Sequence, residues 1–342
     1  MAAELNITNL ELGVDFSVVV PVYNSERTLE TLVERLGKVF RDVGRSYEIV
    51  LTDDCSQDGS WRVIQALHAR GEPIRAFRFM RNHGQHFALK CGLDHCVGRY
   101  VITMDDDLQH PPEEIPKLIA ALEADPELDV VSGVYDVKKH SGFRNLGSAL
   151  NTRLVRAVFR TAPGVTLTSF AIYRRCVVDE VRKTHYARPR IGLIVLSVTS
   201  RIGNVTVRHE PRLVGRSQYT LRKLVADTFD SVLNYSVLPL RMMTWFGIGS
   251  SFLSFIAGLY YLGRYLAGGV GVPGYTSIIL AVLFTGGLTL FCFGMVGEYL
   301  ERIMKNQTAF SEYHVREEIA LPSGAGQVSA GGADPAGREG AA

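Results

Sequence analysis

The chain has 342 residues, enough for one large domain or two medium ones. Its net charge of +2 excludes a nucleic-acid binder that works through bulk positive charge, so no nucleic acid is expected as a partner. The five cysteines are scattered and odd in number and form no Cys-x-x-Cys pair, which disfavours a zinc site and a disulfide framework.

Residues 1–14 are expected to be an ordinary leader, because acidic Glu4 and the lack of a basic start before an apolar run disfavour a cleaved signal peptide. Five apolar or alternating runs then predict strands at residues 16–23, 47–54, 74–80, 100–104 and 129–134. Helical patterns lie between them, for example in residues 59–69. In residues 29–40 one helical face carries Leu29, Leu32, Val33, Leu36 and Phe40. Strands that alternate with helices predict an α/β domain with a mostly parallel sheet.

Polar side chains lie at or just beyond the ends of three of the predicted strands. They are Tyr23 and Asn24, then Asp53 and Asp54, then Asp105, Asp106 and Asp107. In parallel sheets ligands bind beyond the carboxyl ends of the strands, so these groups are expected to converge. The chain has neither a G-x-G-x-x-G nor a G-x-x-x-x-G-K-[ST] motif, which disfavours a dinucleotide dehydrogenase and a P-loop NTPase.

The three adjacent aspartates would repel one another unless a positive group lay among them. Asp105 and Asp107 are two residues apart and would point the same way on an extended strand end, and Gln109 is next in that alternation. Mg²⁺ and Mn²⁺ prefer such oxygen ligands, completed by substrate phosphates. The sequence therefore predicts a divalent metal at Asp105, Asp107 and Gln109, with a solvated acidic turn as the alternative. Three nearby histidines lack metalloprotease spacing and are expected to be exposed in loops: His83, His86 and His110.

Two long uncharged runs lie in the second half of the chain, with 22 residues between Arg241 and Arg264 and 33 between Arg264 and Glu298. A membrane helix needs about 20 apolar residues. The runs therefore predict a transmembrane hairpin with spans at about 242–264 and 275–297, and two buried core helices are the alternative. Basic residues flank the hairpin at Arg216, Arg222, Lys223, Arg241, Arg302 and Lys305, whereas Arg264 lies between the runs. This asymmetry predicts a multi-pass protein of the inner (cell) membrane with both termini in the cytoplasm.

Five segments in order resemble glycosyltransferase family two: "VPVYN", "TDDCSQDGS", "RNHGQHFALKCG", "MDDDLQHPPEEIP" and "RLVGRSQYTLRKL". The likeness spans roughly residues 16–305. Within the family it is strongest to the membrane-anchored polyprenyl-phosphate glycosyltransferases, which include dolichyl-phosphate mannose synthase and the undecaprenyl-phosphate aminoarabinose transferase. The resemblance implies a GT-A (Rossmann-like) catalytic domain at 15–218 and an interfacial amphipathic helix at 219–236. The transmembrane hairpin would then occupy 237–305, and a cytoplasmic, largely disordered tail would occupy 306–342.

The resemblance also implies roles for individual residues. The nucleotide-sugar-binding residues would be Pro21, Tyr23, Asn24, Glu26, Asp53, Asp54, Arg81, Asn82, Gly84, Asp105 and Asp106. The catalytic residues would be Asp107 and Arg212, and the acceptor phosphate would contact Arg212, Arg216, Ser217 and Tyr219. This chain has Ser25 where many relatives have Glu, and Val165 and Ala171 lie near the places of an Asp and an Arg that several relatives carry.

The implied reaction is inverting transfer of a sugar from a nucleotide diphosphate sugar, with UDP expected, to an undecaprenyl-type polyprenyl phosphate. It would occur at the cytoplasmic membrane face with Mg²⁺ or Mn²⁺ and give a lipid-linked sugar for envelope glycan modification. No catalytic base is expected, because a phosphate monoester with a second pKa of about 6 is already ionised at neutral pH. The alternatives are a processive polysaccharide synthase and a non-catalytic membrane helper with a relic transferase domain. A homo-oligomer, such as the tetramer of similar proteins, is also expected.

Overall fold

The computed structural model describes residues 13–135, 165–186, 189–210, 243–249, 275–307 and 313–322, and eight single positions between 252 and 267. The chain divides into two compact units. Unit 1 comprises residues 1–142, 161–217 and 311–342, and unit 2 comprises residues 143–160 and 218–310.

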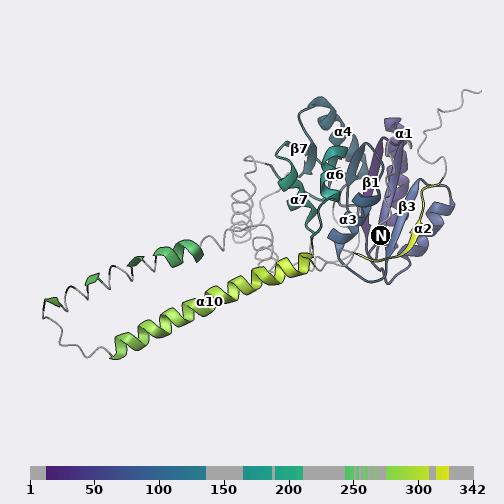
Figure 1. Ribbon diagram of the computed structural model, residues 1–342. Coiled ribbons are helices and arrows are strands. Elements are labelled where there is room, and N and C mark those ends of the chain that lie inside the picture. The colour runs from purple at the N-terminus through teal and green to yellow at the C-terminus, as the bar shows by residue number, and fades with distance from the viewer. Residues whose placement is uncertain are drawn as a thin grey trace, which may run out of the picture. The chain divides into compact units, whose positions relative to one another are not determined.

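Unit 1 is built on an eight-stranded mixed sheet (Figure 1). Its strands are β1 (Phe16–Val22), β2 (Tyr47–Asp53), β3 (Ile74–Phe79), β4 (Tyr100–Thr103), β5 (Val130–Val134), β6 (Ala171–Arg174), β7 (Ile202–Thr206) and β8 (Val315–Ile319). Their spatial order is β7-β5-β6-β4-β1-β2-β3-β8. The strands β1 to β4 pair in parallel, whereas β6 and β8 run antiparallel to their neighbours. All five strands predicted from the sequence are confirmed, as β1 to β5.

Helices cover both faces of this sheet. They are α1 (Leu29–Val43), α2 (Ser60–Ala69), α3 (Gln85–His95), the short 3₁₀ helix η1 (Pro112–Glu114), α4 (Ile115–Ala124), α6 (Arg175–Arg182) and α7 (Ile191–Val198). On one face α1 contacts α2 and α4, and α3 contacts α6 and α7 on the other (Figure 1). All five residues of the predicted helical face in α1 are buried, and they pack with the strands in one apolar core.

The order of the strands determines where a ligand can bind. From β1 to β3 the sheet grows in one direction, and the connection through α3 then returns to place β4 on the other side of β1. Ligands of such sheets bind beyond the carboxyl ends of the strands where the order reverses. In this chain the strands β1 and β4 pair with each other on either side of that position. The position therefore lies just beyond Val22, where β1 ends, and Thr103, where β4 ends.

The strand β8 adds a segment from the end of the chain to the edge of the sheet beside β3. Glu317 accepts hydrogen bonds from the indole nitrogen of Trp61 at 3.0 Å and from Arg78 at 3.1 Å. Tyr313 stacks on Phe79 with ring centroids 5.2 Å apart. The sequence does not predict this strand, because three of its five residues are charged and its stability depends on pairing with a distant segment.

Glu317→Ala is expected to lower the free energy of unfolding by about 1–3 kcal/mol, because the indole N–H of Trp61 would stay buried without its partner. Urea denaturation of the purified full-length chain measures this change. Glu318→Ala is the matched control, since Glu318 is exposed, and its effect should stay within about 0.5 kcal/mol. Equal effects of the two substitutions would show that the contact to Trp61 does not stabilise β8.

Unit 2 contains α10 (Tyr275–Gln307) and a helical segment at residues 243–249. Large apolar side chains are exposed along α10, among them Ile278, Val282, Phe284, Leu290, Phe291 and Phe293. None of the helices formed by the described residues is both long and apolar enough to cross a membrane. The predicted transmembrane hairpin is therefore not confirmed, and the predicted interfacial helix at 219–236 lies outside the described residues.

Candidate active site

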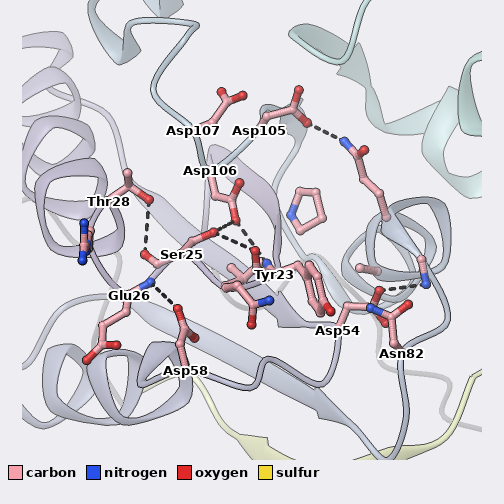
Figure 2. A pocket seen from close by; sticks show the side chains of 17 residues that line it. Tyr23, Ser25, Glu26, Thr28, Asp54, Asp58, Asn82, Asp105, Asp106 and Asp107 are labelled. Atoms are coloured by element: carbon pink, nitrogen blue, oxygen red, sulfur yellow. Dashed lines mark hydrogen bonds between the residues drawn. The ribbon is translucent and has the colours of Figure 1, made fainter. Parts of the chain in front are cut away.

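A pocket of about 670 Å³ lies at the carboxyl ends of the parallel strands (Figure 2). Its walls come from the loop after β1, the end of β2, the turn before α3 and the turn after β4. The pocket thus occupies the place where the strand order reverses, and its volume suits a substrate the size of a nucleotide sugar.

Most of the residues predicted to bind the nucleotide sugar line this pocket. They are Pro21, Tyr23, Asn24, Glu26, Asp54, Asn82, Gly84, Asp105 and Asp106, and the predicted catalytic residue Asp107 joins them. The predicted residues Asp53, Arg81 and Gln109 do not line it. The predicted acceptor residues Arg212, Arg216, Ser217 and Tyr219 lie outside the described residues.

The prediction that Gln109 continues the alternation of Asp105 and Asp107 is wrong. The strand β4 ends at Thr103, the chain turns at residues 106 and 107, and Leu108 has a φ of 58°. A left-handed residue reverses the chain, so Gln109 does not extend the strand toward the pocket. Its backbone N–H instead donates to Asp107 at 3.1 Å.

The pocket carries a large excess of negative charge. Among its described lining residues six are acidic: Glu26, Asp54, Asp58, Asp105, Asp106 and Asp107. Arg27 is the one cation in this set. Carboxylates this close repel one another and would repel a diphosphate. A diphosphate ligand would therefore need a cation to accompany it.

The middle aspartate of the triplet joins two neighbouring strands. Asp106 accepts hydrogen bonds from the backbone N–H of Tyr23, at 3.2 Å, and from the hydroxyl of Ser25, which ties the end of β1 to the end of β4 (Figure 2). Burial raises the pKa of Asp106 to about 6. The two hydrogen bonds lower this pKa, and the negative charges of Asp105 and Asp107 raise it. Asp106 thus holds the loop that presents Tyr23 to the pocket.

Asp54 holds the turn before α3. It accepts hydrogen bonds from the backbone N–H groups of His83 and Gly84, each at 2.7 Å. Burial raises the pKa of Asp54, and the two hydrogen bonds oppose that shift. The N-terminus of a helix favours anions, and the N-terminus of α3 is occupied by this carboxylate of the chain itself. Gly84 has a φ of 97°, which favours glycine, and the turn places Asn82 at the pocket.

Asp53 has a different environment, although it is the adjacent residue. It is fully buried, accepts a hydrogen bond from the backbone N–H of Ser56 at 3.1 Å, and lies 3.3 Å from Arg78. Burial raises its pKa, and Arg78 opposes that shift. Of these two aspartates predicted to bind the nucleotide sugar, the structure thus places Asp54 at the pocket and Asp53 in the core.

Glu26 lies at the pocket wall one residue after the place where many relatives have a glutamate. Its carboxylate accepts a hydrogen bond from the backbone N–H of Gly59 at 3.0 Å, at the start of α2, and its own N–H donates to Asp58 at 3.1 Å. The backbone N–H of Ser25 donates to Ser60 at 2.8 Å. These contacts join the loop after β1 to the start of α2, so Glu26 shapes the pocket wall.

Two residues that the sequence does not predict contact Asp105. The side-chain amide of Gln85 and the hydroxyl of Ser169 each donate to it at 2.6 Å. Gln85 follows the predicted Gly84, so its motif could have indicated it. Ser169 precedes β6, and its proximity to Asp105 depends on a pairing of strands that no local pattern shows.

His110 is buried, with 4% of its surface exposed, so the prediction of an exposed loop residue is wrong for it. It stacks on Phe170 with ring centroids 5.2 Å apart, and its burial lowers its pKa to about 4. Buried His110 is therefore neutral and packs as an aromatic ring. His83 is half-buried, and His86 is exposed as predicted but lies in the first turn of α3 instead of in a loop.

The carboxylates fit a hard divalent cation. Asp105 and Asp107 both line the pocket and offer the oxygen ligands that Mg²⁺ and Mn²⁺ prefer. Within the described part of the chain, no group of three or more His, Cys, Asp or Glu side chains could hold a metal ion. A cation at this place would therefore take further ligands from the substrate, which is how nucleotide-dependent enzymes commonly hold Mg²⁺.

Comparisons with known proteins show the family of the chain. Residues 17–182 match the model of glycosyl transferase family 2. Undecaprenyl-phosphate 4-deoxy-4-formamido-L-arabinose transferases from two strains of Klebsiella pneumoniae are each 34% identical over 312 residues, which cover 90% of this chain and 94% of the relative. The chain belongs to glycosyl transferase family 2. As a member of this family it is a glycosyltransferase, and the mixed sheet of its unit 1 is of the GT-A type.

Solved structures with a similar fold include glucosyl-3-phosphoglycerate synthase from Mycobacterium tuberculosis in complex with Mn²⁺ and UDP-glucose. It is 20% identical, covers 65% of this chain and 77% of its own, and has a TM-score of 0.45. Mannosyl-3-phosphoglycerate synthase from Rubrobacter xylanophilus is 18% identical, with a TM-score of 0.49 over 65% of this chain and 72% of its own.

Proposed function

We propose that this family 2 glycosyltransferase transfers a sugar from a nucleotide diphosphate sugar, with UDP as the nucleotide, to a polyprenyl phosphate of the undecaprenyl type. The acceptor is inferred from the Klebsiella relatives, whose names state undecaprenyl phosphate and which align with nine-tenths of this chain. The observation that carries the donor assignment is the pocket itself, with six carboxylates where the strand order reverses. A nucleotide diphosphate with its cation has the charge and size that this pocket requires.

In this mechanism Asp105 and Asp107 would hold Mg²⁺ or Mn²⁺ at the pocket. The bound ion would supply positive charge that offsets the negative charge of the departing nucleotide diphosphate. The acceptor phosphate is an anion at neutral pH, so it attacks the sugar carbon without losing a proton. Attack opposite the departing diphosphate inverts the configuration at that carbon. The role of the protein is therefore to position two anions and to offset their charge.

Arg212, Arg216, Ser217 and Tyr219 are proposed to bind the acceptor phosphate, and Arg212 also to act in catalysis. This assignment rests on their match to the family motif. The described residues just before them support it, because the backbone N–H of Glu210 donates to the carbonyl of Gln109 at 2.9 Å. Glu210 thus lies beside the turn that carries Asp107, and Arg212 follows only two residues later.

The two uncharged runs are proposed to anchor the enzyme as a transmembrane hairpin, with residues 219–236 as an interfacial helix. Exposed apolar side chains on α10, such as Phe284 and Phe291, support contact with lipid. The excess of basic residues on both outer flanks supports cytoplasmic termini. The catalytic unit would then meet its lipid acceptor at the cytoplasmic face of the inner membrane.

A cysteine at position 269, introduced as Gly269→Cys, is expected to react with a membrane-impermeant maleimide in intact cells. The reason is that residues 265–274 connect the two runs and would lie outside the cytoplasm. A cysteine introduced as Ser329→Cys, in the tail, should react only after the cells are opened, and the unsubstituted chain measures the background. The reverse labelling pattern would contradict the proposed topology.

The proposed reaction is tested by incubating the purified protein with undecaprenyl phosphate and a panel of UDP- and GDP-sugars. Mass spectrometry of the lipid fraction should show one sugar joined to one lipid phosphate, with release of the free nucleoside diphosphate. Products with several sugars would indicate a processive synthase. An active membrane preparation of a Klebsiella relative serves as the positive control, and no product from any donor would support a non-catalytic role.

A further inference from the structure

Asp105 lies opposite a serine from a distant part of the chain. The antiparallel strands β4 and β6 place Ile102 opposite Ile172 and Thr103 opposite Ala171. In this register each step forward along one strand is a step back along the other, so Ser169 falls opposite Asp105. Its hydroxyl donates to Asp105 Oδ2 at 2.6 Å.

The backbone around Ser169 is held from both sides. The hydroxyl of Thr103 donates to the carbonyl of Ser169 at 2.8 Å. The neighbouring Thr168 donates from its backbone N–H to Ser132 at 2.9 Å and from its hydroxyl to the carbonyl of Gly133 at 2.8 Å. These bonds join the segment to β4 and β5. The hydroxyl of Ser169 is therefore presented to Asp105 from a firmly held position.

The second oxygen of Asp105 has its own donor. The side-chain nitrogen of Gln85 donates to Asp105 Oδ1 at 2.6 Å. A carboxylate accepts hydrogen bonds, so the amide nitrogen of Gln85 must face it. Gln85 is the first residue of α3 and follows the turn that Asp54 holds. Two donors from different elements thus fix both oxygens and prevent rotation of the carboxylate about its Cβ–Cγ bond.

We propose that Ser169 and Gln85 are positioning residues that orient the Asp105 carboxylate toward the divalent cation of the nucleotide donor. A carboxylate has about four acceptor sites, so these two hydrogen bonds do not by themselves exclude a cation from it. Neither residue has to touch the cation or the reacting atoms. The inference rests on the proposed function, because it assigns these residues to the cation that the donor diphosphate would bring. The inference also gives a role to the segment from Val165 to Ala171, which contains Ser169 and whose two end residues differ from those of several relatives.

The test measures the affinity for Mn²⁺ of the full-length protein in the presence of UDP, by electron paramagnetic resonance of the unbound ion. Ser169→Ala and Gln85→Ala are each expected to raise the Kd for Mn²⁺ about tenfold, the size of a lost hydrogen bond to a charged group. Ser169→Thr keeps the hydroxyl and should restore an affinity close to that of the wild type. Ser197→Ala removes a hydroxyl that donates to a helix carbonyl on α7, away from the pocket, and should change nothing.

Activity gives a second readout. The lost turnover of Ser169→Ala should be recovered largely at high Mn²⁺ concentration, which a distorted fold would not allow. Wild-type affinity in Ser169→Ala, or an equal loss in Ser169→Thr, would overturn the positioning role while leaving the proposed function intact. Failure of the wild-type protein to bind Mn²⁺ with UDP would overturn both the proposed donor site and this inference.

Discussion

Asp107→Asn is expected to lower the turnover number by about 10²–10³-fold while the protein stays folded. Asp107 lines the pocket beside Asp105, at the turn after β4. The substitution keeps the shape of the side chain and removes the charge that would hold the cation against the leaving diphosphate. Steady-state transfer at saturating nucleotide sugar and lipid measures the loss, and circular dichroism monitors the fold.

Gln109→Ala is the informative comparison for Asp107→Asn. Sequence alternation groups Gln109 with the metal ligands, whereas the structure keeps it out of the pocket lining. Its loss should therefore cost less than about tenfold in turnover, since the backbone N–H that contacts Asp107 is retained. EDTA should abolish the activity of the wild type. Substantial turnover in Asp107→Asn, or full activity in EDTA, would contradict the role of the cation.

Asp54→Ala is expected to raise the KM for the nucleotide sugar by about 100-fold or more. Asp54 accepts two backbone hydrogen bonds at 2.7 Å, and each bond to a charged group is worth about 1.5–3 kcal/mol. Without them the turn that presents Asn82 would lose its fixed shape, and two N–H groups at the start of α3 would lose their partner. Isothermal titration with UDP and Mn²⁺ would measure the weakened binding directly.

Asp53→Asn is the matched control, because Asp53 precedes Asp54 in the chain but lies in the core. It pairs with Arg78, which also contacts Glu317 of β8. Its substitution should lower the free energy of unfolding by about 1–3 kcal/mol, since Arg78 keeps one acidic partner. The KM for the nucleotide sugar should change little at a temperature where the variant is folded. A larger rise in KM for Asp53→Asn than for Asp54→Ala would reverse the assignment of the two aspartates.

The parallel half of the sheet could be predicted from local patterns. The strands β1 and β2 are mostly apolar and are buried along almost their whole length, because both of their faces are covered by helices. In α1 the apolar residues from Leu29 to Phe40 recur at helical spacing, because only one side of this helix packs on the sheet. Parallel strands end at one edge, so the convergence of Asp54 and the aspartates from Asp105 to Asp107 followed from chain order alone.

Local patterns failed where pairing between distant segments decides the structure. The strand β6 places Ser169 against Asp105, and β8 places Glu317 against Trp61. Neither strand is long or apolar enough to be recognised alone, because each depends on hydrogen bonds to a neighbour far away in the sequence. The turn at Leu108 also escaped prediction, since a positive φ at a leucine has no local signal.

The sequence by itself determined the alternation of strands and helices, the strand ends that carry acidic groups and the family to which the chain belongs. Those properties depend on the spacing and order of residues, which folding does not change. Only the tertiary structure decided that Asp54 faces the pocket while Asp53 is buried, and that Asp106 ties β1 to β4. The two residues of an adjacent acidic pair have the same local pattern. Their roles separate only when the neighbouring helix and strands supply Asp54 with two N–H donors and Asp53 with a buried arginine contact.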